Sequence, residues 1–206
     1  MMFSDSELET LSQHVGERLS QKRYAHTLGV VAAAKKIAQY FDKIDISEIV
    51  AAALLHDITK EYSVAEHQKH ISEDDSCDTV EVLHSFSAPS VIRRDFPTYA
   101  TDNVLRAVCR HTVGDPDMTL FDEIIFIADY VEDGRTYPSC VAARHRLYSQ
   151  LADANGADEC EAVLHRAVAS ALSETVKMLT EGDRCVHPNT QRTLDAMLSR
   201  IENMKG

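Results

Sequence analysis

The chain has 206 residues, 44% of them hydrophobic, which is enough to bury the core of a single domain. A formal net charge of −12 argues against a general nucleic-acid-binding surface, and the lack of Trp with only 6% aromatic residues argues against stacking on single-stranded bases. Gly and Pro are few while Ala, Leu, Asp and Glu are plentiful, so the composition favours helices.

Helical periodicity predicts three helices in the first part of the chain. The first covers residues 4–19, with Ser4 or Asp5 as its cap, and the second begins near His26 and runs to Phe41. The third follows Asp45, which together with Glu48 matches a capping box, and it ends in His56-Asp57. Residues 61–78 are polar and acidic, so we expect a short helix and a solvated loop there.

The second part of the chain also reads as helices separated by breaks. Pro89 is expected to help start a helix, and Asp95-Phe96-Pro97 interrupts the pattern. Further helices are predicted at 103–111, 119–131, 139–153, 157–180 and 190–204, with 184–190 extended. No segment alternates as a strand would, so the sequence predicts an all-α protein in one domain.

The cysteines and the N-terminus bear on location. The sequence contains Cys77, Cys109, Cys140, Cys160 and Cys185, an odd number without a CxxC pair, which is typical of a reducing compartment. No stretch approaches membrane-spanning length, and the first residues lack the basic and apolar segments of a secretory signal. We therefore expect a cytoplasmic protein that does not contact a membrane.

The pair His56-Asp57 ends an unusually apolar run. Between Ile46 and Leu55 only Ser47 and Glu48 are polar, as in a helix buried on nearly all sides. A buried imidazole and a buried carboxylate both need partners, because an unpaired buried charge is costly. A metal ion would satisfy both groups at once.

Two further residues complete a candidate set of ligands. His26 lies near the start of an apolar helix, and Asp129 lies late in another, so helix packing can bring both to His56 and Asp57. Imidazole nitrogen with carboxylate oxygen suits Fe, Mn, Zn or Co better than Ca. Taken singly, each His is more often a hydrogen-bonded core residue and each Asp a helix cap, whereas the joint pattern is much stronger.

The set resembles the signature of the HD-domain metal-dependent phosphohydrolases: an early His, a later His-Asp pair and a distant Asp. The surrounding segments are similar to the YqeK branch, and this similarity covers roughly residues 20–190: Arg23–Val30, Ala53–Lys60, Leu83-His84, Arg110–Thr112 and Ile127–Glu132, followed by Arg135 and Pro138. That branch cleaves diadenosine tetraphosphate symmetrically to two ADP. The resemblance implies an HD helical bundle with this activity.

The resemblance also implies a role for each residue of the site. Metal ligands would be His26, His56, Asp57 and Asp129, and catalytic groups would be Asp57, Lys60, His84 and His111. Polyphosphate contacts would come from Arg23, Lys60, His84, His111 and Arg135. The nucleotide pocket would include Cys185, Val186, His187, Pro188, Asn189 and Thr190. The cofactor would be one or two divalent transition-metal ions, iron first, with Mn, Co or Zn as alternatives.

The domain expected from this resemblance spans residues 1–206, with a core at about 20–135 and C-terminal helices that complete the nucleotide pocket. The chain departs from the branch where Asp115-Pro116-Asp117 replaces Arg-Pro-Gly and Glu132-Asp133 replaces Glu-Pro, and both changes add acid near the site. The remaining histidines are interpreted as solvated surface residues: His14, His67, His70, His145 and His165. No catalytic role is expected for Cys109 or Cys185.

Two other functions stay open on the sequence. One is an HD phosphohydrolase of a nucleoside monophosphate or a guanosine polyphosphate alarmone. The other is a non-catalytic HD module that binds a nucleotide and regulates a partner. The partner expected is a small dinucleoside polyphosphate rather than a polymeric nucleic acid, and a homodimer is left open.

Overall fold

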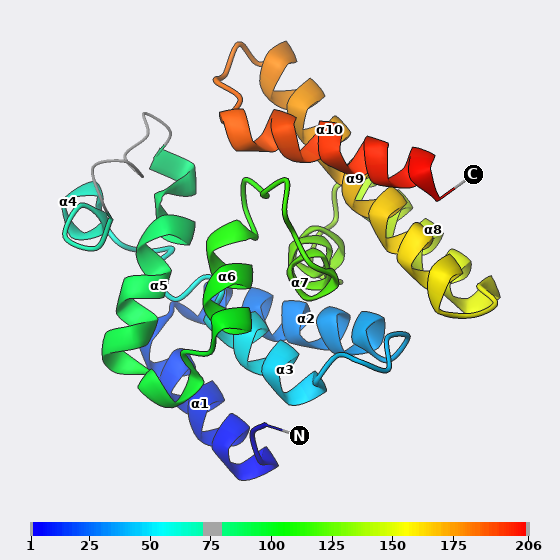
Figure 1. Cartoon of the computed structure of the whole chain (residues 1–206). Helices are drawn as coiled ribbons and strands as arrows, with labels where there is room; N and C mark the ends of the chain where they lie inside the picture. Colours follow the sequence, from blue (N-terminus) through cyan, green and yellow to red (C-terminus); the bar gives the residue numbers. More distant parts are fainter. Residues whose placement is uncertain (1, 72–79, 205–206) are drawn as a thin grey trace.

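The computed structural model describes residues 2–71 and 80–204, which form helices and turns without a strand (Figure 1). The predicted all-α fold is confirmed. In chain order the α-helices are α1 (Asp5–Arg18), α2 (Gln21–Ala38), α3 (Ile46–Leu55), α4 (Val64–His67), α5 (Leu83–Asp95), α6 (Asp102–Arg110), α7 (Leu120–Val131), α8 (Pro138–Asp153), α9 (Ala157–Glu181) and α10 (Pro188–Asn203). Short 3-10 helices are η2 (Val80–Val82) and η3 (Pro97–Tyr99).

Helix α3 is the centre of the packing. It contacts α1, α2, α6 and α7, and every residue from Ser47 to Leu55 is buried (Figure 1). The apolar run of the sequence therefore becomes a helix enclosed by others, as predicted. Because α3 is enclosed, His56 and Asp57, which follow it directly, lie in the interior.

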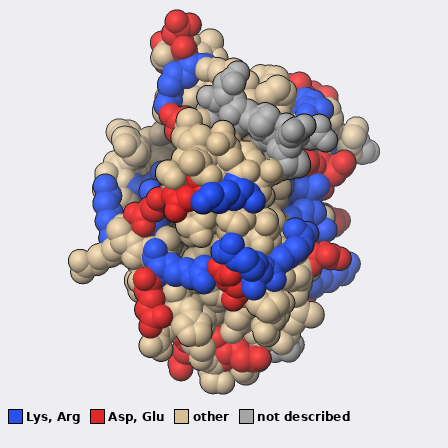
Figure 2. Space-filling view, turned by 90° about the vertical axis from the view of Figure 1, so that its left-hand side faces the viewer, with Lys and Arg blue, Asp and Glu red and all other residues tan. Residues whose placement is uncertain are grey.

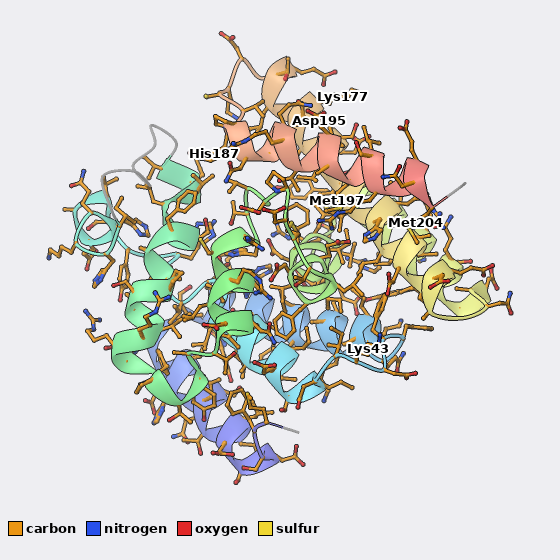
Figure 3. The ribbon with its side chains drawn as sticks, in the orientation of Figure 1. Lys43, Lys177, His187, Asp195, Met197 and Met204 are labelled. Carbon is orange, nitrogen blue, oxygen red and sulfur yellow. The ribbon has the colours of Figure 1, made fainter. Side chains whose placement is uncertain are left out.

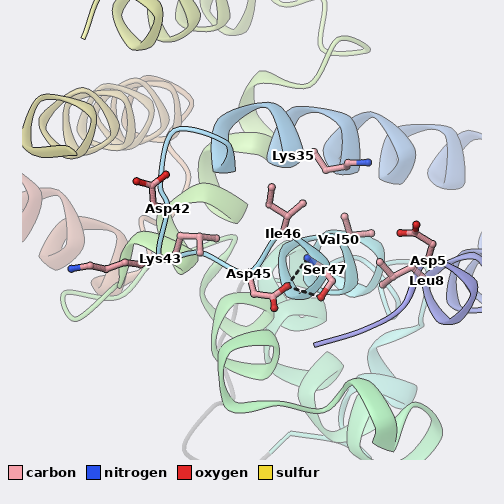
Figure 4. A pocket seen from close by; sticks show the side chains of 10 residues that line it. Asp5, Leu8, Lys35, Asp42, Lys43, Asp45, Ile46, Ser47 and Val50 are labelled. Atoms are coloured by element: carbon pink, nitrogen blue, oxygen red, sulfur yellow. Dashed lines mark hydrogen bonds between the residues drawn. The ribbon is translucent and has the colours of Figure 1, made fainter. Parts of the chain in front are cut away.

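Side-chain caps begin several helices. Ser4 caps α1 with a complete capping box. Asp45 accepts hydrogen bonds from the backbone N–H of Ser47 and Glu48 at the start of α3, and Figure 4 shows its bonds to Ser47. Glu48 does not complete the predicted box at α3. Its carboxylate instead accepts hydrogen bonds from Thr101 (2.5 Å) and Asn103 (3.1 Å) at the start of α6.

The predicted boundaries of three helices were wrong. Pro89 lies inside α5 rather than at its start, because packing of the buried residues before and after it outweighs the missing backbone N–H. Helix α2 begins at Gln21 rather than near His26, because the Ser20 side chain caps it, and it ends at Ala38 instead of Phe41, where the chain turns tightly. Helix α10 begins at Pro188, a favourable first position, so the extended stretch is shorter than expected.

The C-terminal helices cover one side of the molecule. Helices α9 and α10 run in opposite directions against each other, and α9 also packs on α7 and α8 (Figure 1). The buried carboxylate of Glu123 on α7 joins these layers, since it pairs with His165 on α9 (2.7 Å) and Arg200 on α10 (2.9 Å). The prediction that His165 lies at a solvated surface was wrong, because Glu123 gives its imidazole a buried partner.

Charges on the outer surface are mixed. Figure 2 shows Lys and Arg interspersed with Asp and Glu on the side where α4 and α5 lie. Asp95 at the end of α5, for example, pairs with both Arg18 and Arg94 at 2.6 Å. No helix within the described residues is both long and apolar enough to cross a membrane. Residues 72–78 of the segment predicted as a short helix and a solvated loop lie outside the described residues.

Candidate metal centre

The structure brings the predicted ligands to one point. His26 comes from the second turn of α2 and Asp129 from the last turn of α7, while His56 and Asp57 follow α3 directly. His84, in the first turn of α5, and His111, just after α6, reach the same point from the opposite side. Their convergence follows from the packing of α2, α6 and α7 around α3.

Asp57 lies at the middle of the centre. Its Oδ2 is 3.4 Å from Nε2 of His56 and 3.7 Å from Nε2 of His26. Its Oδ1 is 3.3 Å from Nε2 of His84 and 3.7 Å from Nε2 of His111. The two oxygens of one buried carboxylate thus face two pairs of imidazoles.

Asp129 provides the second carboxylate. Its Oδ1 lies 3.0 Å from Nε2 of His26 and 2.7 Å from a guanidinium nitrogen of Arg135. Donor atoms of His26, His56 and Asp129 are all within 4.8 Å of one another, and so are those of His56, Asp57 and His111. The two groups share His56, an arrangement that can serve one ion or two.

Three imidazoles, those of His26, His56 and His111, are oriented by a contact of Nδ1, the ring nitrogen that faces away from the carboxylates. Nδ1 of His56 donates to the carbonyl of Ala53 (2.7 Å), and Nδ1 of His111 donates to the carbonyl of Val108 (2.6 Å). Nδ1 of His26 lies 3.2 Å from the carboxylate of Glu132. These bonds place the ring proton on Nδ1 and leave the Nε2 lone pair for a metal, the arrangement usual for histidine ligands.

The residues fit a divalent transition metal. Nε2 of His26 and Nε2 of His56 are buried and make no hydrogen bond within the described part of the chain. A buried polar atom without a partner is costly, and both atoms point to the carboxylates that would share an ion with them. Nitrogen and oxygen donors in this mixture suit Fe, Mn, Co or Zn.

Neighbouring imidazoles and an arginine stabilise the ionised form of the two carboxylates. Burial alone would raise the pKa of the Asp57 carboxyl, but the neighbouring His56, His111 and His84 hold that pKa well below its usual range. Burial likewise opposes ionisation of Asp129, whose pKa is nevertheless lowered by His26 and Arg135. Both carboxylates are therefore ionised at neutral pH, as metal ligands must be.

Three cations surround these carboxylates. Arg23 pairs with Asp57 Oδ2 at 2.8 Å, Arg135 pairs with Asp129, and Nζ of Lys60 lies 3.2 Å from Nδ1 of His84. Helix α3 ends at Leu55, and a series of turns places Lys60 at the centre. Burial lowers the pKa of Lys60, although the nearby carboxylates oppose this effect.

Comparison with known proteins bears on what this centre is. Residues 23–134 match the HD domain family. A protein of Halalkalibacterium halodurans named symmetrical bis(5'-nucleosyl)-tetraphosphatase is 30% identical over 90% of this chain and 94% of its own length. The chain belongs to the HD domain family.

Further relatives agree with this assignment. A protein of Staphylococcus aureus with the same name is 32% identical, over 69% of this chain and 75% of that protein. A crystal structure from Clostridium acetobutylicum, described as a predicted HD superfamily hydrolase involved in NAD metabolism, superposes with a TM-score of 0.76 at 24% identity. The match covers 97% of this chain and all of that one. This likeness supports the HD fold alone.

We call the cluster of His26, His56, Asp57, His84, His111 and Asp129 the HD centre. Other residues support this cluster, and the sequence did not single them out. The Glu132 carboxylate orients His26. At the start of α5, the Thr59 hydroxyl donates to the carbonyl of His84 (2.9 Å) and the Ser87 hydroxyl donates to Thr59 (3.0 Å). Nδ1 of His67 lies 2.8 Å from the Ser87 hydroxyl. His67 is buried, so its predicted place on a solvated face was wrong. Of these supporting residues only Glu132 could have been recognised in the sequence, because it is an acid at the end of an apolar helix, one turn after Asp129.

A cavity of about 440 Å³ adjoins the HD centre on the side of α9 and α10. Three residues of the predicted nucleotide segment line it: Cys185, His187 and Thr190. His187 lies where α10 begins, toward α5, and its ring is 5.7 Å from that of Phe86 (Figure 3). Asn189 lines a neighbouring cavity, whereas Val186 and Pro188 line neither.

Two of the acidic departures from the family pattern pair with arginines outside the HD centre. Asp115 pairs with Arg110 at 3.2 Å, and the almost fully exposed Asp133 lies 3.3 Å from Arg144. Another cavity, of about 630 Å³ at the start of α3, contains none of the predicted site residues (Figure 4). The chemistry of the described residues is thus concentrated at the HD centre and the cavities beside it.

Proposed function

We propose that this chain is a metal-dependent hydrolase that splits diadenosine tetraphosphate between its two inner phosphates to give two ADP. The observation that carries the proposal is the convergence of four family ligands, His26, His56, Asp57 and Asp129, inside an arc of three cations. The relatives from H. halodurans and S. aureus, which are named for this reaction, support it.

The cations bind the substrate in this proposal. A polyphosphate resists hydrolysis because its oxygens repel an anionic nucleophile, so the site has to offset that charge. Arg23, Lys60 and Arg135 enter the centre from different elements and can contact successive phosphates. Together they position the inner phosphates over the two carboxylates.

The remaining groups act on the attacking water. A divalent transition metal, when bound, lowers the pKa of a coordinated water and stabilises charge on the phosphoryl oxygens. Through Oδ1, Asp57 can orient an attacking water. His84 and His111 face the same oxygen, and burial keeps the pKa of His84 well below its usual range, so its neutral ring can accept a hydrogen bond.

We further propose iron as the metal, with Mn, Co or Zn as substitutes, and one or two ions per chain. The mixed nitrogen and oxygen ligand set supports a first-row transition metal. A cytoplasmic location completes the proposal, because the cysteine pattern and the substrate class both suit a reducing compartment.

The test is to load the protein with Fe, Mn, Co or Zn, incubate it with diadenosine tetraphosphate and separate the products by chromatography. ADP should be the only product, and Asp57→Asn should lower turnover by at least about 100-fold, because it removes charge from the middle of the ligand set. Formation of AMP and ATP, or no turnover with any of these metals, would contradict the proposal. A panel of nucleoside monophosphates and guanosine polyphosphates tests the neighbouring activities.

A further inference from the structure

A second cavity adjoins the HD centre on the side opposite the α9–α10 cavity. It has a volume of about 790 Å³ and lies between the first turns of α2 and the loop from α7 to α8. Its wall includes His26, Arg23 and Arg135, which contact Asp57 Oδ2 and Asp129. Its size is within the range of small-ligand sites.

The two cavities flank the centre from different sides. The α9–α10 cavity includes Thr112, whose hydroxyl lies 3.0 Å from Nε2 of His84 and 3.1 Å from Nε2 of His111. Those imidazoles face Oδ1 of Asp57, whereas the second cavity is adjacent to Oδ2. A molecule that spans both cavities therefore has its middle at Asp57.

The charge of the second cavity suits an anionic ligand. Arg23, Arg135 and the exposed Lys22 line it. The three acids of its wall have partners in the protein. Glu61 accepts bonds from the backbone N–H (2.7 Å) and hydroxyl (2.6 Å) of Ser20, and Glu132 binds His26 and the backbone N–H of Gly134. The exposed Asp133 lies 3.3 Å from Arg144. Arg23 and Arg135 pair with Asp57 and Asp129 but keep 30% and 35% of their side chains exposed, so their remaining N–H groups, together with Lys22, can meet a phosphate.

The rim of this cavity carries an exposed aromatic ring. Tyr137 is 67% exposed and makes no hydrogen bond through its side chain to the described residues. Its backbone is fixed, because it caps α8 directly before Pro138 and its carbonyl accepts a bond from Val141 N–H (3.0 Å). A rigid backbone with a solvated ring is a suitable platform for a planar base.

We propose that this second cavity binds the second nucleoside half of a dinucleoside polyphosphate, with its base stacked on Tyr137 and its phosphates on Arg23 and Arg135. The inference rests on the proposed function. It explains symmetric cleavage, since one nucleoside diphosphate lies on each side of Asp57 and the bond between the inner phosphates lies at the centre.

The experiment compares two substrates in three variants. Diadenosine tetraphosphate has a second nucleoside and adenosine 5'-tetraphosphate does not. In Tyr137→Ala we expect kcat/KM for the dinucleotide to fall by about tenfold or more, mainly through KM, which is the size of one lost base–aromatic stack. Tyr137→Phe should stay near the wild type. For the mononucleotide, kcat/KM should be unchanged. If the mononucleotide is not cleaved, its inhibition constant against the dinucleotide should be unchanged instead.

The control is Leu198→Ala, an exposed apolar residue of α10 that lines neither cavity, and metal content is measured in every variant. Unchanged use of the dinucleotide by Tyr137→Ala, or an equal loss for both substrates, would overturn this proposal and leave the proposed function intact. If the wild-type protein cleaves neither substrate, both the proposed function and this assignment are contradicted.

Discussion

Gly29 on α2 shows how a residue without any functional group can determine the metal centre. It lies one turn after His26, and the carboxylate of Glu132 occupies the space beside it. That carboxylate lies 3.2 Å from Nδ1 of His26 and accepts the N–H of Gly134 at 2.6 Å. The orientation of a predicted ligand thus depends on the missing side chain of a neighbour.

Substitution Gly29→Ala should therefore weaken metal binding without unfolding α2. Alanine ordinarily stabilises a helix interior by about 0.5–1 kcal/mol, but here its Cβ would overlap the Glu132 carboxylate and displace it from His26. Loss of such an outer partner typically costs about 10- to 100-fold in metal affinity. A competition titration against a chelator measures the affinity, and circular dichroism measures the helix content.

Leu28→Ala is the matched control, because Leu28 lies on the same helix with 42% of its side chain exposed and should retain wild-type affinity. Equal affinities of Gly29→Ala and the wild type would show that Glu132 does not orient His26.

At the scale of the element, the sequence predicted most helices and the residues that begin them. Periodicity and caps are local properties, so α1, α6 and α7 could be placed within a residue or two. The local pattern cannot show the partner of a side chain. For that reason Glu48 was expected to cap its own helix, and the buried contacts of His67 and His165 were missed.

The start of α3 carries a pH-dependent contribution to stability. Partial burial raises the pKa of Asp45, but bonds from the Ser47 hydroxyl and backbone N–H outweigh burial and lower it from 3.8 to about 2. A carboxylate with a lowered folded pKa stabilises the protein above its unfolded pKa, and this contribution is lost as the pH falls toward 2.

Asp45→Asn should accordingly lower the free energy of unfolding at pH 7 by about 0.5–1 kcal/mol, since a neutral cap loses the interaction with the helix dipole. The difference from the wild type should shrink as the pH is lowered from about 4 toward 2. Urea titrations across this range measure it. Asp42→Asn, in the exposed turn before α3, should show no such dependence, and a constant Asp45→Asn difference would contradict the assignment.

At the scale of the whole molecule, the HD centre joins elements that are distant in sequence. Its residues come from α2, α5 and α7 and from the segments after α3 and α6, while Glu123 on α7 links these helices to α9 and α10 through His165 and Arg200. The family pattern in the sequence predicted the ligands, but only packing around α3 explains why these residues meet.

Removal of the metal should therefore lower the stability of the entire chain. An ion that binds only the folded state adds about 2.7 kcal/mol when its concentration is 100 times Kd, and metal-free protein should lose this amount because the buried Nε2 atoms of His26 and His56 lose their partner. Urea unfolding followed by circular dichroism and by tyrosine fluorescence should give coincident transitions, both shifted together by a chelator. Asp57→Asn should lack the shift. Transitions that separate would show that α9 and α10 unfold independently of the HD core, and a midpoint independent of metal would show that the centre binds no ion.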